Sequence, residues 1–198
     1  MRRLVVASNN AGKLRELRAL LSQLDCEVLA QGELRVASID EPHSTFIENA
    51  LAKARHAAKA SGQPALADDS GLCCEALNGA PGVRSARLAG GAAGSSDNNA
   101  ALLRLLAGQS NRRAHYVCVL VALRTADDPE PLIAEGRWSG EIIDTPRGAN
   151  GFGYDPHFWL ADRNCTAAEL DADAKNRISH RGLAMAALAS KLRLLWSW

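Results

Sequence analysis

The hydrophobic positions alternate between short apolar runs and longer segments with helical spacing. The runs at 4–7, 26–30 and 65–67 are typical of buried strands. Leucines at positions 14, 17, 20, 21 and 24 lie on one face of a helix. A second, alanine-rich helix is predicted to follow the capping box that begins at Thr45 and to stop before Gly62. Alternation of strands and helices predicts an α/β fold.

The second half of the chain completes this pattern. A helix is predicted over 97–106, with Gly108 ending it, after a loop at 90–94. The apolar stretches 114–124 and 132–143 flank a turn and predict a hairpin. A long amphipathic helix is predicted from Gly182 to about residue 195. We therefore expect a mixed, twisted sheet flanked by helices.

In the sequence Ala-Leu-Ala-Asp-Asp-Ser-Gly-Leu at 65–72, a short apolar run ends in two carboxylates, a hydroxyl and a glycine. It predicts a strand that ends at Asp68, Asp69 and Ser70, and ligands bind at such strand ends in open α/β sheets. Side chains alternate along a strand, so the two carboxylates are expected to face different ways. A hard divalent ion such as Mg²⁺ would compensate their charge. An ordinary polar turn is the alternative.

A second polar loop lies between the first strand and the first helix. Ser8-Asn9-Asn10-Ala11-Gly12-Lys13 places a lysine at a helix N-terminus, which favours a phosphate. The sequence is not a P-loop, because the first glycine is missing and Leu14 follows the lysine. A plain loop capped by Ser8 or Asn10 is the alternative.

The third and fourth candidate segments lie near the C-terminus. Gly151-Phe152-Gly153-Tyr154-Asp155 offers aromatic faces for a base and a carboxylate for a loop or ligand. Lys175, His180 and Arg181 precede the last helix, where an anion or a base edge can be bound. Together with the two earlier loops, they form the inventory of a nucleoside triphosphate site.

Composition narrows the class of protein. The 198 residues carry 23 Lys plus Arg and 22 Asp plus Glu, a net charge of +1, so no overall field attracts nucleic acid or a membrane. The longest aliphatic stretch, 117–123, is too short to span a bilayer, and a cytoplasmic location is expected. The five cysteines match no zinc or redox spacing and are expected to be reduced thiols.

Five motifs, in order and spacing, resemble the Ham1-like inosine triphosphate pyrophosphatase family and, within it, the bacterial XTP/dITP diphosphatases. They are Ser-Asn-Asn-Ala-Gly-Lys, Phe-Ile-Glu-Asn-Ala, Ala-Asp-Asp-Ser-Gly-Leu, Gly-Phe-Gly-Tyr-Asp-Pro and Ser-His-Arg. The resemblance implies one catalytic domain over 1–198, two lobes with the active-site cleft between them, and a homodimer. It also implies Mg²⁺-dependent hydrolysis of dITP, ITP and XTP to monophosphate plus pyrophosphate.

The resemblance also assigns roles to individual residues. Asp69 becomes the general base and a metal ligand, and Glu41 becomes the second metal-side carboxylate, with Asp40 as the alternative. Glu48 has a sufficient role as a helix cap. The residues implied to bind the nucleotide are Ser8, Asn9, Asn10, Ala11, Gly12, Lys13, Ser70, Phe152, Gly153, Tyr154, Asp155, Lys175, His180 and Arg181.

Base selection would depend on the purine 6-position, where hypoxanthine and xanthine present an acceptor and adenine a donor. Arg181 or backbone N–H groups near Phe152 are the candidate donors. Two other functions stay open: a Maf-like nucleotide pyrophosphatase with other base specificity, and a nucleotide sensor without catalysis. A serine hydrolase is disfavoured, because the Gly-x-Ser-x-Gly elbow is missing.

Overall fold

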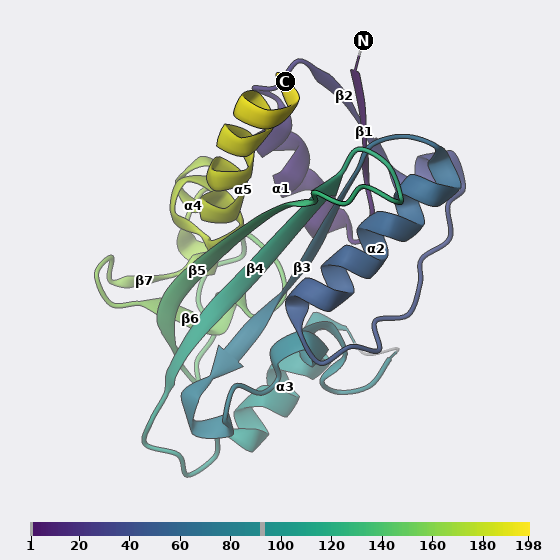
Figure 1. The fold of residues 1–198 in the computed structure, drawn as a ribbon. Helices are drawn as coiled ribbons and strands as arrows, with labels where there is room; N and C mark the ends of the chain where they lie inside the picture. The colour runs from purple at the N-terminus through teal and green to yellow at the C-terminus, as the bar shows by residue number, and fades with distance from the viewer. Residues whose placement is uncertain (1, 92–93) are drawn as a thin grey trace. The chain divides into compact units, whose positions relative to one another are not determined.

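The computed structural model describes residues 2–91 and 94–198, so Ala92 and Ala93 of the predicted loop at 90–94 lie outside the described residues. The strands form one seven-stranded sheet in the order β2-β1-β3-β4-β5-β6-β7 (Figure 1). β1 pairs in parallel with β2 and β3, whereas β6 pairs antiparallel with β5 and β7. The predicted α/β fold with a mixed sheet is confirmed. The strands are β1 (Arg2–Val6), β2 (Cys26–Ala30), β3 (Ala65–Cys74), β4 (Arg113–Leu123), β5 (Leu132–Ile142), β6 (Phe158–Leu160) and β7 (Cys165–Thr166).

Five α-helices among the described residues connect these strands or follow them. Thr45 caps the second of them, since its Oγ1 accepts a hydrogen bond from the Glu48 N–H at 3.4 Å and donates one to Glu48 Oε2 at 2.5 Å. Gly62 ends the same helix in the left-handed conformation, with φ of 65°. The helices are α1 (Ala11–Leu21), α2 (Phe46–Ser61), α3 (Ser95–Leu105), α4 (Ala172–Ile178) and α5 (His180–Lys191).

The chain forms two compact units, and β3, β4 and β5 contribute residues to both. Unit 1 comprises residues 1–69, 118–136 and 181–198. Unit 2 comprises residues 70–117 and 137–180. The single catalytic domain expected from the sequence stays a prediction.

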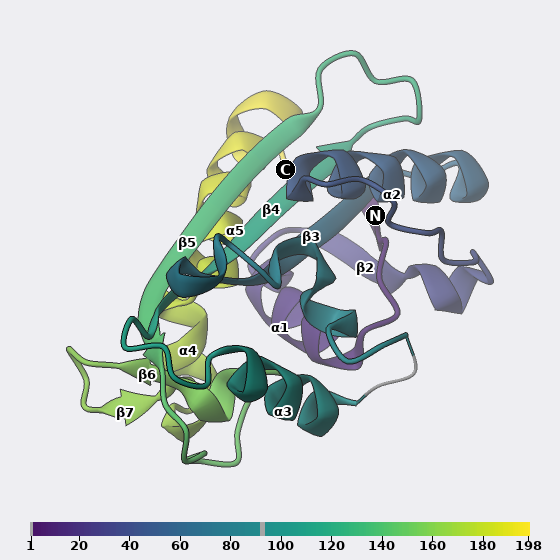
Figure 2. The same cartoon turned by 90° about the horizontal axis from the view of Figure 1, so that it is seen from below.

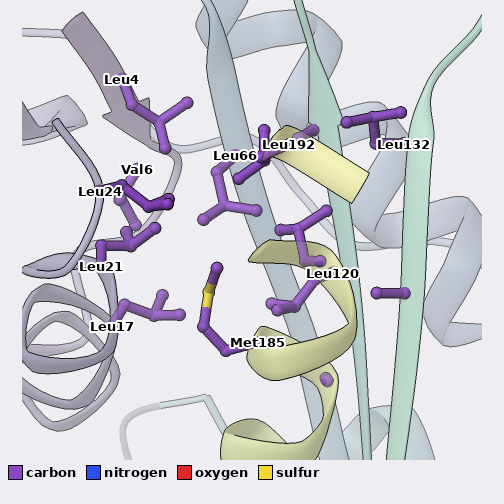
Figure 3. Packing of buried hydrophobic residues seen from close by; sticks show 14 of the residues in the cluster. Leu4, Val6, Leu17, Leu21, Leu24, Leu66, Leu120, Leu132, Met185 and Leu192 are labelled. Atoms are coloured by element: carbon purple, nitrogen blue, oxygen red, sulfur yellow. The ribbon is translucent and has the colours of Figure 1, made fainter. Parts of the chain in front are cut away.

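The core of unit 1 has a helical layer on each face of its strands. Leu4 and Val6 of β1 pack with Leu17 and Leu21 of α1, and Met185 of α5 joins the same cluster (Figure 3). Helix α2 lies on the opposite face of the strands from α1 and α5 in both ribbon views (Figure 1, Figure 2). Because side chains alternate along a strand, successive residues of β1 and β3 point toward different helices.

Unit 2 has a separate apolar core that is rich in aromatic residues. Leu72 of β3 and Leu102 of α3 pack there with Tyr116, Trp138 and Phe158, all of them buried. The Tyr116 and Phe158 ring centroids lie 4.7 Å apart, and those of Trp138 and Phe158 lie 5.2 Å apart. Both distances are within the range of favourable aromatic pairing.

Two expectations about element ends were wrong. β3 does not end at the carboxylates, nor do they form a turn: the strand runs through Asp68, Asp69 and Ser70 to Cys74. Gly71 makes this path possible, because a Cβ there would lie 2.2 Å from the Gly82 carbonyl oxygen. The last helix begins at His180 rather than Gly182, and the sequence analysis missed α4, a seven-residue helix that carries Lys175.

Two smaller observations concern membrane spans and thiols. Among the described residues, no helix is both long enough and apolar enough to cross a bilayer. All five cysteines are free thiols, and Cys73, Cys74 and Cys118 are buried.

Candidate active site

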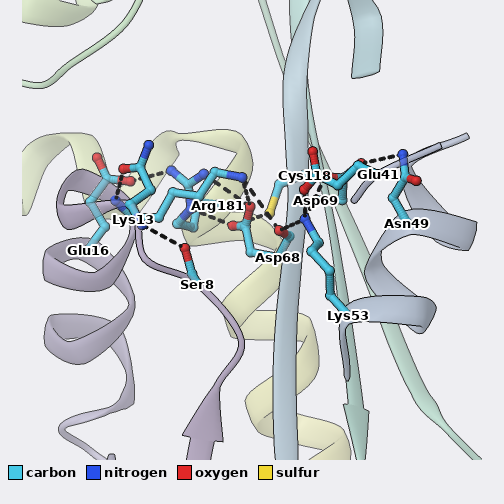
Figure 4. A network of polar contacts seen from close by, with 11 residues as sticks. Ser8, Lys13, Glu16, Glu41, Asn49, Lys53, Asp68, Asp69, Cys118 and Arg181 are labelled. Atoms are coloured by element: carbon cyan, nitrogen blue, oxygen red, sulfur yellow. Dashed lines mark hydrogen bonds and ion pairs between the residues drawn. The ribbon is translucent and has the colours of Figure 1, made fainter. Parts of the chain in front are cut away.

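Asp68 and Asp69 project from opposite faces of β3, as the strand alternation predicts. Asp68 faces Lys13 of α1 and Arg181 of α5, whereas Asp69 faces Lys53 of α2. Figure 4 shows the two groups of side chains on either side of the strand. All of these residues belong to unit 1. Each carboxylate therefore has its own set of cationic partners.

Asp68 is buried, and three side-chain donors contact its carboxylate. Lys13 Nζ lies 2.7 Å from its Oδ1, and Arg181 Nε lies 2.7 Å from its Oδ2. The Cys118 thiol donates to the same Oδ2 at 3.3 Å. Burial alone would raise the pKa of Asp68, but Arg181 and Lys13 hold it well below its usual range. Burial and the Asp68 charge raise the pKa of Cys118 well above its usual value, so this thiol stays protonated.

Arg181 is shared between two carboxylates. Its Nη1 lies 2.5 Å from Glu16 Oε2, and its side chain is only 1% exposed. Burial by itself would lower the pKa of Arg181, but Asp68 and the other nearby anions raise it well above its usual value. The guanidinium is thus a buried cation that fixes Asp68. These contacts give no support to the role of base-edge donor predicted for Arg181.

Asp69 belongs to a second network, on the α2 side of the strand. Lys53 Nζ lies 2.8 Å from Asp69 Oδ1 and 2.5 Å from Glu41 Oε1. It also donates to the Asp68 carbonyl oxygen at 2.9 Å. Asn49 Nδ2 donates to the other Asp69 oxygen, Oδ2, at 3.4 Å. One ammonium therefore joins the two carboxylates that the resemblance placed at the metal.

Burial and neighbouring charges shift the pKa values of Asp69 and Lys53 in this second network. Burial raises the pKa of Asp69, and Glu41 adds to the rise while Lys53 and Lys13 oppose it. Burial would lower the pKa of Lys53, but Asp69 and Glu41 together raise it. Lys53 therefore stays a cation, and Asp69 is a stronger base than an exposed aspartate. A shift in this direction favours a carboxylate that accepts protons.

Glu41 and Asp69 are the candidate ligands for a divalent cation. Among residues 2–91 and 94–198, no group of three or more His, Cys, Asp or Glu side chains is placed to hold a metal ion. Glu41 and Asp69 nevertheless both contact one cationic atom, Lys53 Nζ. Mg²⁺ is commonly bound by one or two carboxylates, with waters and substrate phosphates as the remaining ligands. The pair therefore fits such an ion.

The polar loop before α1 is organised as a helix cap. Asn10 Oδ1 accepts a hydrogen bond from the Lys13 N–H at 3.0 Å, and Ser8 Oγ accepts one from the Asn10 N–H at 3.2 Å. Asn9 Nδ2 donates to Ser38 Oγ at 2.8 Å. Helix α1 begins at Ala11. Its first N–H groups and the Lys13 ammonium form the kind of site that favours an anion.

In unit 2, Asp155 is the centre of a buried polar cluster. Lys175 Nζ lies 2.5 Å from its Oδ2, and the Phe152 N–H donates to the same oxygen at 2.9 Å. The Tyr116 hydroxyl donates to Oδ1 at 3.3 Å. Lys175 Nζ also lies 4.9 Å from the centre of the Phe152 ring, within cation–π range. The predicted loop residues and Lys175 are thus brought together.

The aromatic residues of unit 2 divide into two roles. Tyr154 is buried and its hydroxyl donates to the Ser85 carbonyl oxygen at 2.7 Å, so its contacts are those of a core residue and do not support the predicted base platform. Gly153 accepts from Asn99 Nδ2 at 3.1 Å. The His180 ring stacks on Tyr116, with centroids 4.5 Å apart and 9° between the planes.

Ser70, within β3, is half-buried.

Several residues of these networks were not predicted from the sequence. Lys53 and Asn49 are the most important, and their spacing was a usable signal, because residues four apart lie on one helix face. Lys53 lies beside the alanine-rich face of α2, and a cation in such an apolar environment is stable only when an anion compensates its charge. The other missed residues are Glu16, Tyr116 and Cys118.

Residues 4–191 match the sequence model of the Ham1 family. The chain belongs to the Ham1 family. This Ham1 protein is 61% identical over 197 residues to a protein of Ralstonia nicotianae named dITP/XTP pyrophosphatase, covering 98% of each chain. It is 60% identical over 196 residues to a Bordetella pertussis protein of the same name, covering 98% of this chain and 92% of the relative.

Solved structures of other Ham1 proteins share the fold. A HAM1 protein from Coxiella burnetii is 49% identical, covers 97% of this chain and 98% of its own, and superposes with a TM-score of 0.90. The Staphylococcus aureus Ham1 protein is 40% identical, with 96% and 98% coverage and a TM-score of 0.85. The α/β fold of this Ham1 protein is therefore that of its family.

Proposed function

We propose that this Ham1 protein is a nucleoside triphosphate pyrophosphatase that converts dITP, XTP and ITP to the monophosphate and pyrophosphate. The observation that carries the proposal is the pair of networks on β3, in which Lys13 and Lys53 flank two adjacent carboxylates from opposite faces. The names of the relatives from Ralstonia nicotianae and Bordetella pertussis support the substrate class.

The residues of unit 1 match the demands of triphosphate hydrolysis. That reaction requires the phosphate charge to be neutralised and a water to be oriented in line with the bond that breaks. Lys13 and the first N–H groups of α1 bind phosphate oxygens. Asp69, with its raised pKa, accepts the proton of the attacking water. Glu41 and Asp69 would hold Mg²⁺, which supplies further positive charge at the phosphates.

Lys53 has a different role in the resting protein. Its ammonium contacts both Glu41, which is half-buried, and Asp69, which is buried, so it offsets the repulsion between the two carboxylates. If Glu41 and Asp69 held Mg²⁺, the Lys53 ammonium would be available to a phosphate group. Lys53 is thus assigned to charge balance in the free protein and to phosphate binding in the complex.

The cluster around Asp155 in unit 2 is assigned to the base and sugar. Phe152 offers a ring face, and Lys175 and His180 offer donors for the 6-keto oxygen that hypoxanthine and xanthine share. An adenine would present its amino donor to these groups and leave donors facing each other. Recognition of inosine and xanthine over adenosine follows from this arrangement.

The test is a substrate panel with product identification. Purified protein is incubated with ITP, XTP, dITP, GTP, ATP and dUTP, each with Mg²⁺ and with chelator, and monophosphate and pyrophosphate are quantified. We expect fast, metal-dependent release from ITP, XTP and dITP, with ATP and GTP nearly untouched. Preference for dUTP would favour a Maf-like specificity instead. Tight binding of ITP without turnover would make the protein a sensor.

Three further properties belong to the same proposal: one catalytic domain over 1–198, a homodimer and a cytoplasmic location. Light scattering coupled to size exclusion measures the dimer directly, and a mass of 21.1 kDa corresponds to one chain. A mass near that value at micromolar concentration would contradict the homodimer without affecting the proposed reaction.

A further inference from the structure

We infer that Asn49 is a positioning residue that sets the placement of Glu41 relative to Asp69 and thereby controls the affinity for the divalent cation. This inference rests on the proposed function of Glu41 and Asp69 as the metal-side carboxylates. Asn49 is 1% exposed and lies near the start of α2. Its side-chain amide is hydrogen-bonded to His43 and Asp69, so it acts on Glu41 through the groups that it holds.

The hydrogen-bonding capacity of the Asn49 amide is used by two partners. Its Oδ1 accepts from the His43 N–H at 3.1 Å, and its Nδ2 donates to the His43 carbonyl oxygen at 3.1 Å. The second Nδ2 hydrogen is directed to Asp69 Oδ2 at 3.4 Å. A primary amide has two donor hydrogens, so both are used. The side chain thus binds a loop backbone and a carboxylate at the same time.

The loop that Asn49 holds is the one that carries Glu41. His43 lies two residues after Glu41, and residues 35–43 form no helix or strand. A segment without backbone ladders depends on side chains to fix its position. Both backbone groups of His43 are bound to the Asn49 amide. The position of Glu41 is therefore tied to a helix rather than left to the loop.

Asn49 and Lys53 act on Asp69 as a pair. They lie four residues apart on α2 and contact different oxygens of the carboxylate, Oδ2 and Oδ1. Lys53 neutralises the charge of Asp69 and also contacts Glu41. Asn49 is neutral, and its hydrogen bond fixes the orientation of the Asp69 carboxylate. Such partners behind metal ligands typically change metal affinity by about 10–100-fold when they are removed.

Asn98 in unit 2 provides a matched control. Its Oδ1 accepts from the Ala89 N–H at 2.8 Å, and its Nδ2 donates to the Ala86 carbonyl oxygen at 3.1 Å. It is 6% exposed and, like Asn49, lies on a helix and binds one backbone N–H and one backbone carbonyl of a neighbouring segment. Both of these bonds go to the backbone, and neither goes to a carboxylate. Asn98→Leu therefore removes the same kind of backbone contact without touching the proposed metal ligands.

The experiment compares Asn49→Leu with Asn98→Leu in the full-length protein. Leucine is close to asparagine in size and removes every side-chain hydrogen bond, and Asn49→Ser serves as a second variant if the first does not fold. Mn²⁺ alone is titrated by electron paramagnetic resonance, and Mg²⁺ activation of ITP hydrolysis is measured in parallel. We expect Asn49→Leu to weaken Mn²⁺ binding and raise the activating Mg²⁺ concentration by about tenfold or more, whereas Asn98→Leu changes neither.

A double-mutant cycle with Glu41→Gln completes the test. If Asn49 acts by placing Glu41, the combined loss of Mn²⁺ affinity is smaller than the product of the two single losses. The inference is overturned if Asn49→Leu keeps wild-type Mn²⁺ affinity, if it behaves like Asn98→Leu, or if the wild-type protein binds no Mn²⁺. Failure of the proposed function has another signature: no triphosphate is hydrolysed although Mn²⁺ binding and its dependence on Asn49 are intact.

Discussion

Asp68 and Asp69 are neighbours in sequence, yet lysines from two different helices bind them: Lys13 of α1 lies 2.7 Å from Asp68, and Lys53 of α2 lies 2.8 Å from Asp69. The strand directs the two carboxylates to opposite faces, so they do not compete for one cation. This separation gives them opposite pKa shifts, downward for Asp68 and upward for Asp69. The anionic form is therefore favoured at Asp68, and the protonated form becomes more accessible at Asp69.

Asp69→Asn is expected to lower kcat by about 100-fold or more, because a neutral amide cannot accept a proton from water. The fold should persist, since Asn49 and Lys53 still meet a polar side chain of the same size. Steady-state kinetics with ITP and thermal melting measure the two effects. Asp127→Asn, at an exposed turn residue of unit 1, is the control. Near-normal kcat in purified Asp69→Asn would remove Asp69 from the mechanism.

Asp68→Asn is expected to reduce stability rather than chemistry alone. Removing the charge leaves Arg181 and Lys13 without their shared anion, a change that typically costs about 3–5 kcal/mol in a buried site. The lowered pKa means that Asp68 stabilises the fold above its unfolded value of 3.8 and loses that effect as pH falls below it. Urea unfolding from pH 3 to 8 measures this difference. A gap between wild type and variant that widens toward pH 3 would contradict the assignment.

Lys13→Ala is expected to raise KM for ITP by about tenfold or more, because it removes a charged hydrogen bond to phosphate, with a smaller effect on kcat. Arg181 still holds Asp68, so the protein should fold. Arg15→Ala removes a positive charge from an exposed position of the same helix and serves as the control. If both KM and kcat of Lys13→Ala match the wild type, the phosphate-loop assignment is wrong.

Gly151→Ala is expected to impair base binding through Asp155. A Cβ at Gly151 would lie 2.0 Å from Asp155 Oδ2, the oxygen bound by Lys175 and the Phe152 N–H. Gly151 has a φ of 73°, so strain of about 1–2 kcal/mol also arises.

Gly108→Ala separates these two effects. Gly108 has a similar φ of 75°, but its added Cβ would meet no atom within 4 Å. Both variants should melt at lower temperature, and only Gly151→Ala should raise KM for ITP. Equal KM values for the two variants would mean that Asp155 has no part in binding the base.

Local patterns predicted most of the fold. The apolar runs predicted β1, β2 and the start of β3, and the capping box at Thr45 predicted the first residue of α2, because these signals lie in a few neighbouring residues. The predicted end of β3 was wrong, because polar residues usually end a buried strand. Here cations from α1, α2 and α5 compensate the charge of two carboxylates inside the strand. Short α4 carried too few apolar positions to show a period.

The candidate site was predicted only in part, because many of its contacts join residues that are distant in sequence. Asp69, Glu41 and Lys13 were predicted from motifs, and the structure places each of them in the networks of unit 1. Lys53 and Glu16 were missed, because a charged residue on a helix usually faces solvent and its buried partner is distant in sequence. The nucleotide contact expected of Arg181 from its motif stays a prediction, and in the structure its guanidinium contacts Glu16 and Asp68.

β3 also sets where this protein can be re-engineered. Nine of its ten residues are buried and the tenth is half-buried, so no position on it is an open surface that tolerates arbitrary replacement. Gly71 is the extreme case, because any side chain there meets the Gly82 carbonyl and the Ser85 hydroxyl. Libraries that randomise residues 65–74 would mostly return unfolded protein. Altered substrate preference is better sought by diversifying Asn150, Phe152 and the exposed positions of α4 while β3 is kept constant.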